Sequence, residues 1–281
     1  MAVAAPPAPV PSPPAAKPPP PVSAPPALKP APPPRAGVLR DVGTVRRDSI
    51  HATAWTTTGM AKVQGDVDVG SGTTTGLVSV GGKLSADAFR AKGTLEVAGP
   101  TDVRELLRVD GTVHLQAAVH AGTLEARGTL RSPADVRVDR GLTVMGMFEA
   151  PSAHVGLFDL TGTAEIPGDL DALLSVRARF RGDSTLGAIR AKSVVLSGPP
   201  TALLPTLFRK VFGGSAHVRV DRIEADSVEL AAVEVEFVHA KEIVLGAGAV
   251  VREVEGTIVR RHPSSRVGPE SKSRPPHGLT R

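Results

Sequence analysis

The chain of 281 residues contains no cysteine and no tyrosine, and its aromatic content is only 3%. Without cysteine, neither a disulfide framework nor a thiolate metal site can form. The scarcity of aromatic side chains excludes the stacking platform that single-strand nucleic-acid binders use. Asparagine is missing as well, so asparagine ladders cannot stabilise a stack of strands, and such a stack must rely on aliphatic packing and backbone hydrogen bonds.

Long apolar runs are also absent. No window of about 18 apolar residues occurs, and therefore no transmembrane helix is expected. The segment 1–10 lacks the basic start and the continuous apolar stretch of a signal peptide. We therefore expect a cytoplasmic protein, which basic tails can hold at the inner face of the membrane.

Proline and positive charge are concentrated towards the two chain ends. The first 34 residues carry 16 of the 27 prolines, and residues 257–281 carry six Lys or Arg against one Glu. Such segments bury too little apolar surface to offset the entropy of ordering. We predict a disordered proline-rich tail over 1–49 and a disordered basic tail over 258–281. Basic tails favour anionic partners, here a membrane surface or an acidic protein, and no specific nucleic acid.

Glycine recurs between these tails at nearly constant intervals. The recurring glycines are Gly93, Gly111, Gly128, Gly146, Gly162, Gly182 and Gly198. Fixed self-similarity of this kind indicates stacked repeats that share one core. Apolar residues alternate with polar ones inside each repeat, as in Leu95-Glu-Val97 and Val136-Arg-Val138, which is the period of a β-strand. The pattern predicts an all-β fold, a single β-helix over 50–257 with three short strands per turn.

One segment interrupts the repeat, at about 199–214. Pro199 and Pro200 end a strand, apolar residues follow at helical spacing, and Gly213 and Gly214 end the segment. This pattern predicts a short helical insert. It either covers a flank of the coil or binds a partner or membrane surface. The candidate contact residues are Leu204, Leu207, Phe208, Val211 and Phe212.

The segments 217–230, 238–246 and 250–256, together with repeated Gly-x-Leu-x-Ala units upstream, resemble the bactofilin family of polymer-forming cytoskeletal proteins. The resemblance covers about residues 59–256. It implies a right-handed β-helix that joins end to end into filaments without a nucleotide, flanked by disordered tails, and it implies a scaffold rather than an enzyme. This chain departs from the family in its longer repeat region and in the insert.

A β-helix also presents open ends with unpaired backbone groups, which recruit another chain unless they are capped. The alternatives are a homopolymer and a capped monomer, and the sequence does not choose the polarity of a filament. The candidate end residues are Trp55, Met60, Val63, Phe237, Val250 and Val251.

Motifs for catalysis or cofactor binding are weak. No zinc helix, phosphate loop or dinucleotide fingerprint is present, and the glycine pairs are typical of turns. The eight histidines form no metal spacing, although His114 and His120 could approach each other on one face. We predict no catalytic residue, no metal, no cofactor and no small-molecule substrate. The alternative function is a monomeric β-helix that acts on carbohydrate or binds a surface, because aspartates are plentiful along the turns.

Overall fold

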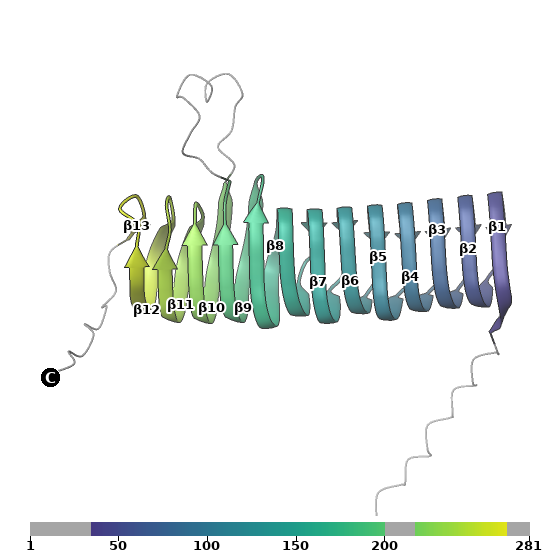
Figure 1. The fold of residues 1–281 in the computed structure, drawn as a ribbon, viewed down its shortest axis with the longest axis horizontal. Coiled ribbons are helices and arrows are strands. Elements are labelled where there is room, and N and C mark those ends of the chain that lie inside the picture. Colours follow the sequence, from purple (N-terminus) through teal and green to yellow (C-terminus); the bar gives the residue numbers. More distant parts are fainter. Residues whose placement is uncertain (1–34, 200–216, 269–281) are drawn as a thin grey trace, which may run out of the picture. The chain divides into compact units, whose positions relative to one another are not determined.

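The computed structural model describes residues 35–199 and 217–268. Within these residues the chain forms thirteen β-strands and no helix. The strands pair in parallel and in chain order, as the row in Figure 1 shows. The strands are β1 (Ala36–Arg47), β2 (Ile50–Val63), β3 (Val67–Val80), β4 (Leu84–Val97), β5 (Thr101–Leu115), β6 (Val119–Arg131), β7 (Val136–Glu149), β8 (Ala153–Phe180), β9 (Ser184–Ser197), β10 (Val218–Ala231), β11 (Glu234–Leu245), β12 (Val250–Arg261) and β13 (Arg266–Val267). The predicted all-β solenoid is confirmed.

The solenoid is longer than the predicted range 50–257. It begins at β1, inside the segment predicted to be a disordered tail, and it ends at β13. β1 lacks the alternating apolar pattern of the later turns, because a charged residue, Asp41, stands where the turns from β4 onward have an apolar one. The remaining parts of the predicted tails, and the predicted helical insert, lie outside the described residues.

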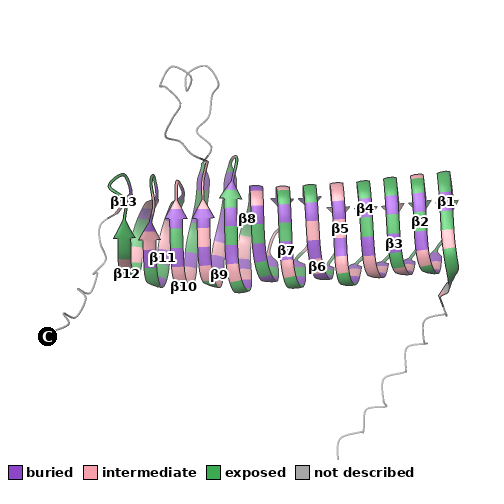
Figure 2. Cartoon of the chain, viewed as in Figure 1, coloured by how far each residue is buried: buried purple, intermediate pink, exposed green. Residues whose placement is uncertain are grey.

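Each turn carries three inward-facing pairs. In β4 these pairs are Leu84 with Ala86, Phe89 with Ala91, and Leu95 with Val97, all of them buried. We call the outward surfaces of these three segments the first, second and third face. Figure 2 shows the resulting alternation of buried and exposed bands. Successive turns repeat in a nearly constant register, so equivalent inward positions stack into continuous apolar columns, as with Leu95 beside Val113.

Glycines mark the corner between the second and third faces. The glycine corner consists of Gly43, Gly59, Gly76, Gly93, Gly111, Gly128, Gly146 and Gly162. All eight have a positive φ, between 86° and 148°. A Cβ atom on any of the last seven would lie within 2.4 Å of the carbonyl oxygen of the preceding glycine. Only glycine fits, because it has no side chain and takes positive φ without steric cost.

Beyond Gly162, the strands end at this same corner of the solenoid. The Arg181 amide donates to the Gly162 carbonyl at 2.8 Å, and the Gly198 amide donates to Ala231 at 2.7 Å. The predicted glycine repeat is therefore one structural corner, and it starts earlier than the sequence pattern indicated. Between β9 and β10 the register step is longer than elsewhere, since Ser184 pairs with Val218, because the interrupting segment lies between them.

Aromatic rings occupy the core at two places. Trp55, Gly72 and Phe89 stack in one inward column, and the two rings approach to 6.2 Å between centroids over the side-chain-free Gly72. Phe148 and Phe158 form a second pair at 5.9 Å. The first pair fits because Gly72 leaves room for the rings, since a Cβ on Gly72 would lie 2.3 Å from the Phe89 ring.

The substitution Gly146→Ala tests the glycine corner. Its Cβ would meet the Gly128 carbonyl oxygen at 1.9 Å, in a backbone with φ of 141°. We expect the free energy of unfolding to fall by more than about 3 kcal/mol, measured by urea denaturation and circular dichroism. Gly141→Ala in the same strand is the control, because its Cβ finds no atom closer than 3.9 Å. Equal stability of the two variants would contradict the assignment.

Ala232 offers the opposite test at the same corner. It is the single described non-glycine residue with positive φ, at 52°. The left-handed region disfavours residues with a Cβ. Ala232→Gly is therefore expected to raise the unfolding free energy by about 0.5 kcal/mol. Ala231→Gly, in the extended part of β10, is expected to lower it, and a loss of stability in both variants would be inconsistent with strain at residue 232.

Candidate functional site

The first face carries a column of polar side chains, one from each turn. The column consists of His51, Asp68, Ser85, Asp102, His120, Arg137, His154, Asp171, Arg190, Glu224, His239 and Glu255. It arises because the nearly constant register brings equivalent positions of successive turns together. Four of the eight histidines of the chain lie in this column.

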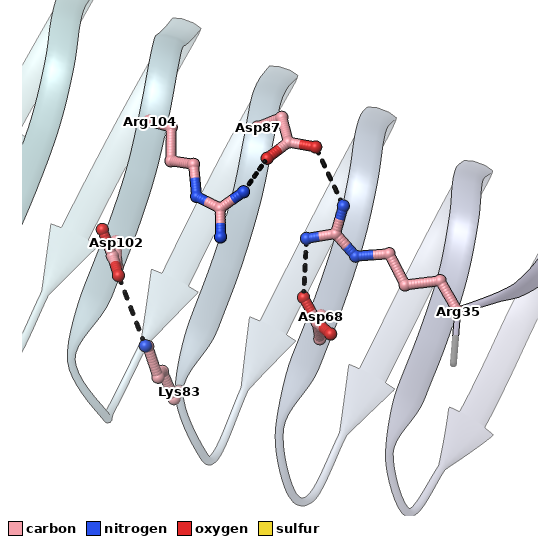
Figure 3. Close-up of polar contacts among 6 residues, drawn as sticks. All are labelled: Arg35, Asp68, Lys83, Asp87, Asp102 and Arg104. Carbon is pink, nitrogen blue, oxygen red and sulfur yellow. Dashed lines mark hydrogen bonds and ion pairs between the residues drawn. The ribbon is translucent and has the colours of Figure 1, made fainter. Parts of the chain in front are cut away.

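At the start of the column, one arginine joins several turns (Figure 3). Arg35 donates to Asp68 on β3 at 3.0 Å and to Asp87 on β4 at 2.8 Å. Asp87 in turn pairs with Arg104 on β5 at 3.0 Å. Hydrogen bonding to the two carboxylates raises the pKa of Arg35 above its ordinary value. This chain of contacts fixes the residue that begins the described structure onto the flank of later turns.

Histidines and carboxylates alternate further along the first face. His120 lies between Asp102, at 3.3 Å, and Asp139, at 3.1 Å. His154 lies 3.2 Å from Asp171 on the following turn. His114 and His120, which could have met on one face, lie on different faces, because the register places His114 on the third face, between the positions of Glu96 and Arg131. A search at one-turn and two-turn spacings would have found the pairs that do form.

A hollow of about 740 Å³ opens on the first face where β7, β8 and β9 meet. Gly156 lines this hollow, and its backbone lies close to the preceding turn, since a Cβ there would lie 2.2 Å from the Arg140 carbonyl oxygen. Val155 and Ala172 are buried beneath it, and Leu173 stands at its rim with 73% of its surface exposed. Arg190 at the edge pairs with Asp169 and Asp171, both at 3.1 Å. The hollow suits a ligand with an apolar part and a charged group.

Most carboxylates of the first face form ion pairs, and this affects how they can contact a ligand. Within the described ranges, no group of three or more His, Asp or Glu side chains converges to hold a metal ion. Asp169 and Asp171 share Arg190, and hydrogen bonding to both raises the pKa of that guanidinium. A carboxylate that accepts hydrogen bonds from a guanidinium has fewer oxygen lone pairs left for a ligand.

The N-terminal end of the core is filled by a polar cluster. Asp41 points inward in the column that Thr57 and Thr74 continue, and its carboxylate accepts hydrogen bonds from Arg47, at 2.6 and 3.1 Å, and from the Trp55 indole, at 3.1 Å. Hydrogen bonds from Arg47, and to a smaller extent from Trp55, lower the pKa of Asp41 despite its burial. We call Asp41, Arg47 and Trp55 the polar plug.

The C-terminal end has a different character. Val254 and Ile258 in β12 are half-buried, whereas their partners one turn earlier, Val238 and Ile243, are fully buried. In the described part of the chain, β13 covers only the first two residues of β12. The described residues therefore cover the apolar cross-section at this end only in part.

The residues predicted to lie at the ends of the solenoid are found at several places in the structure. Trp55 and Val63 are buried under β1, and Met60 is an exposed residue beside the glycine corner. Val251 is buried and Val250 half-buried beneath β13, near the C-terminal end.

Phe237 is half-buried on β11, with the Arg222 guanidinium 4.9 Å above its ring. The five residues predicted for the insert, Leu204 to Phe212, lie outside the described residues. Among the residues that are described, the structure contains no helix with the length and hydropathy needed to cross a membrane.

Acid titration tests the polar plug. The lowered pKa of Asp41 means that its contribution to stability is complete above the unfolded value of about 4 and is lost as the pH falls through the folded value. Asp41→Asn should therefore lower the unfolding free energy by about 1–2 kcal/mol at pH 7, and the deficit should shrink towards pH 3. Fluorescence of Trp55, the single tryptophan of the chain, reports unfolding at this end.

The control for this titration is Asp48→Asn, which changes an exposed carboxylate just after β1. At pH 7 its unfolding free energy should equal that of the unmodified protein, because the Asp48 side chain is exposed. A deficit of Asp41→Asn that stays constant from pH 7 to pH 3 would show that the charge of Asp41 does not stabilise the plug.

Comparisons with known proteins add no family to this geometry. No family model, no curated protein and no solved structure matches the chain.

Proposed function

We propose that the protein is a bactofilin-like cytoskeletal scaffold that assembles end to end without a nucleotide. The observation that carries this proposal is the incompletely covered end at β12, where Val254 and Ile258 remain half-buried. A second copy that added its turn there would bury both side chains and pair the free backbone groups of β12. Burial of an aliphatic side chain contributes about 1.5–3 kcal/mol, and unpaired strand edges recruit further strands.

The proposed role is structural rather than enzymatic. The regular alternation of small and aliphatic residues supports a rod, and the ion-paired carboxylates of the first face do not support acid–base chemistry. The terminal segments outside the described residues would recruit partners, such as acidic proteins or an anionic membrane surface. The protein would then be cytoplasmic and peripheral at the inner face of the membrane, with no cofactor, no small-molecule substrate and no specific nucleic acid.

A monomeric β-helix that binds carbohydrate or another surface is the second candidate. The hollow around Gly156 favours it, because this hollow combines an exposed leucine with charged groups. The two candidates differ in a simple property, since the scaffold changes size with concentration and the monomer does not.

Substitution of the open end tests assembly. We expect the purified protein to form rods whose length increases with concentration, seen by electron microscopy and analytical ultracentrifugation without nucleotide. Val254→Lys combined with Ile258→Lys should abolish the rods, because two charges would be desolvated in the contact. Circular dichroism should show an intact solenoid.

The control for assembly is Val259→Lys, a change of an outward residue in the same strand that is already 61% exposed. It should assemble like the unmodified protein. A uniform monomer at every concentration, or normal rods in the double lysine variant, would contradict assembly through β12.

A further inference from the structure

The glycine corner changes character along the solenoid. On the second and third faces of β1 to β4, outward positions carry five cations and one carboxylate, Glu96. Three exposed apolar side chains lie beside the corner glycines among these cations. We call this surface the basic corner, and it consists of Arg40, Val42, Arg46, Met60, Lys62, Leu77, Arg90 and Lys92.

The five cations of the basic corner form no ion pair in the part of the chain that the structure describes, in contrast to cations elsewhere in the same turns. Arg35, Arg47 and Lys83 are all paired with aspartates on the first face or in the plug. Parallel strands lie about 4.8 Å apart, so the unpaired charges of adjacent turns reinforce one another's potential.

The next four turns of the same corner provide an internal comparison. On β5 to β8, Arg108, Arg127 and Arg131 each pair with a carboxylate. Exposed methionines occur there too, Met145 and Met147. These later turns are surrounded by acids, namely Asp110, Glu125, Glu149, Asp159 and Glu165. Apolar exposure is thus shared by both halves of the corner, whereas its cations are unpaired on β1 to β4 and paired from β5 to the first half of β8; unpaired cations return further along β8, at Arg177 and Arg179.

Apolar side chains lie at the centre of the basic corner. Val42 is 82% exposed, Met60 49% and Leu77 38%, and they flank the corner glycines on successive turns. Threonines fill the remaining positions of the second face on β2 and β3, at Thr56, Thr58, Thr73 and Thr75. A convex apolar ridge between cations matches the interface of an anionic bilayer, where headgroups meet acyl chains. Nucleic acid fits less well, because the aromatic rings of these turns, Trp55 and Phe89, are buried.

We propose that the basic corner is a docking surface for an anionic lipid membrane. Cations from β1, β2 and β4 meet acidic headgroups, and Val42, Met60 and Leu77 enter the headgroup region. Because the acidic part of the corner begins at β5, the first four turns contact the membrane while the acidic turns that follow them, up to the first half of β8, are held away from it. This docking belongs to the folded solenoid rather than to its tails, and it does not require assembly.

Vesicle co-sedimentation of the full chain tests this proposal. The probes are vesicles of phosphatidylcholine alone and vesicles with one third phosphatidylglycerol. We expect binding to the anionic vesicles only, weakening as salt screens the charges. The corner variant replaces five unpaired cations with serine at Arg40, Arg46, Lys62, Arg90 and Lys92. Its partition coefficient should fall at least about tenfold, because each cation contributes separately to the attraction.

A matched variant removes the same charge elsewhere. It replaces five exposed cations that have no ion pair in the described structure, namely Arg137, Arg177, Arg179, Lys192 and Arg260. This variant should bind within about threefold of the unmodified protein, since its basic corner is intact. Equal losses in the two variants would show attraction by net charge alone. Retained binding in the corner variant would assign the contact to the tails, and either result overturns the proposal, as does absence of binding by the unmodified protein.

The apolar side chains distinguish a bilayer from a general polyanion. Met60→Ser with Leu77→Ser should weaken vesicle binding several-fold and leave binding of single-stranded RNA unchanged. Vesicle binding that is unchanged in this double variant would show that the surface binds polyanions in general, contrary to the proposal. All measurements are repeated in the Val254→Lys, Ile258→Lys background. If the protein with these two lysines binds vesicles but forms no rods, membrane docking is supported independently of assembly.

Discussion

The close approach of successive backbones at the glycine corner is the constraint on which the rest of the structure depends. Seven of its eight glycines would place a Cβ atom within 2.4 Å of the carbonyl oxygen one turn earlier. A side chain there would force adjacent turns apart and break the parallel hydrogen bonds. With the glycines in register, the residues that flank them are in register too, so that inward residues form columns of core and outward residues form columns of like or opposite charge.

Much of this fold could be predicted from the sequence, because the repeat and the alternation are local patterns. Glycine recurrence located the corner, and alternating residues such as Leu95 and Val97 identified inward positions correctly. The first turn was missed because Asp41 interrupts the apolar pattern, and its role emerges only when Arg47 and the Trp55 indole are seen to surround it. The aromatic columns were missed for a related reason, since the space above Gly72 is supplied by neighbouring turns.

Side-chain partners were harder to predict than elements. His120 has no acidic neighbour close in sequence, yet it lies between Asp102 and Asp139, which the stacking of turns brings to it. Spacing within a single repeat could suggest only the pair with His114, which the register separates onto different faces. A periodic search would recover the first-face column. It would not recover the contrast between paired cations on that face and unpaired cations at the basic corner, because pairing depends on which carboxylates reach across a turn.

The two ends of the solenoid differ in chemistry, and this gives the domain a direction. A buried carboxylate and its partners fill the core at β1, whereas half-buried aliphatic residues remain at β12. The basic corner strengthens the difference, since it occupies the turns nearest the polar plug. If the proposed assembly through β12 and the proposed docking of the basic corner both occur, they use different parts of the solenoid and do not compete.

Arg35 links the start of the described structure to turns further along the stack. It stands immediately after the proline-rich segment, and its guanidinium grips Asp68 and Asp87, on the third and fourth strands. Tension applied through that segment is therefore shared with turns well inside the stack, instead of peeling β1 from β2 one hydrogen bond at a time. Both contacts are ion pairs, and they weaken as the salt concentration rises. The strength with which Arg35 holds the start of the described structure therefore depends on the salt concentration of the solution.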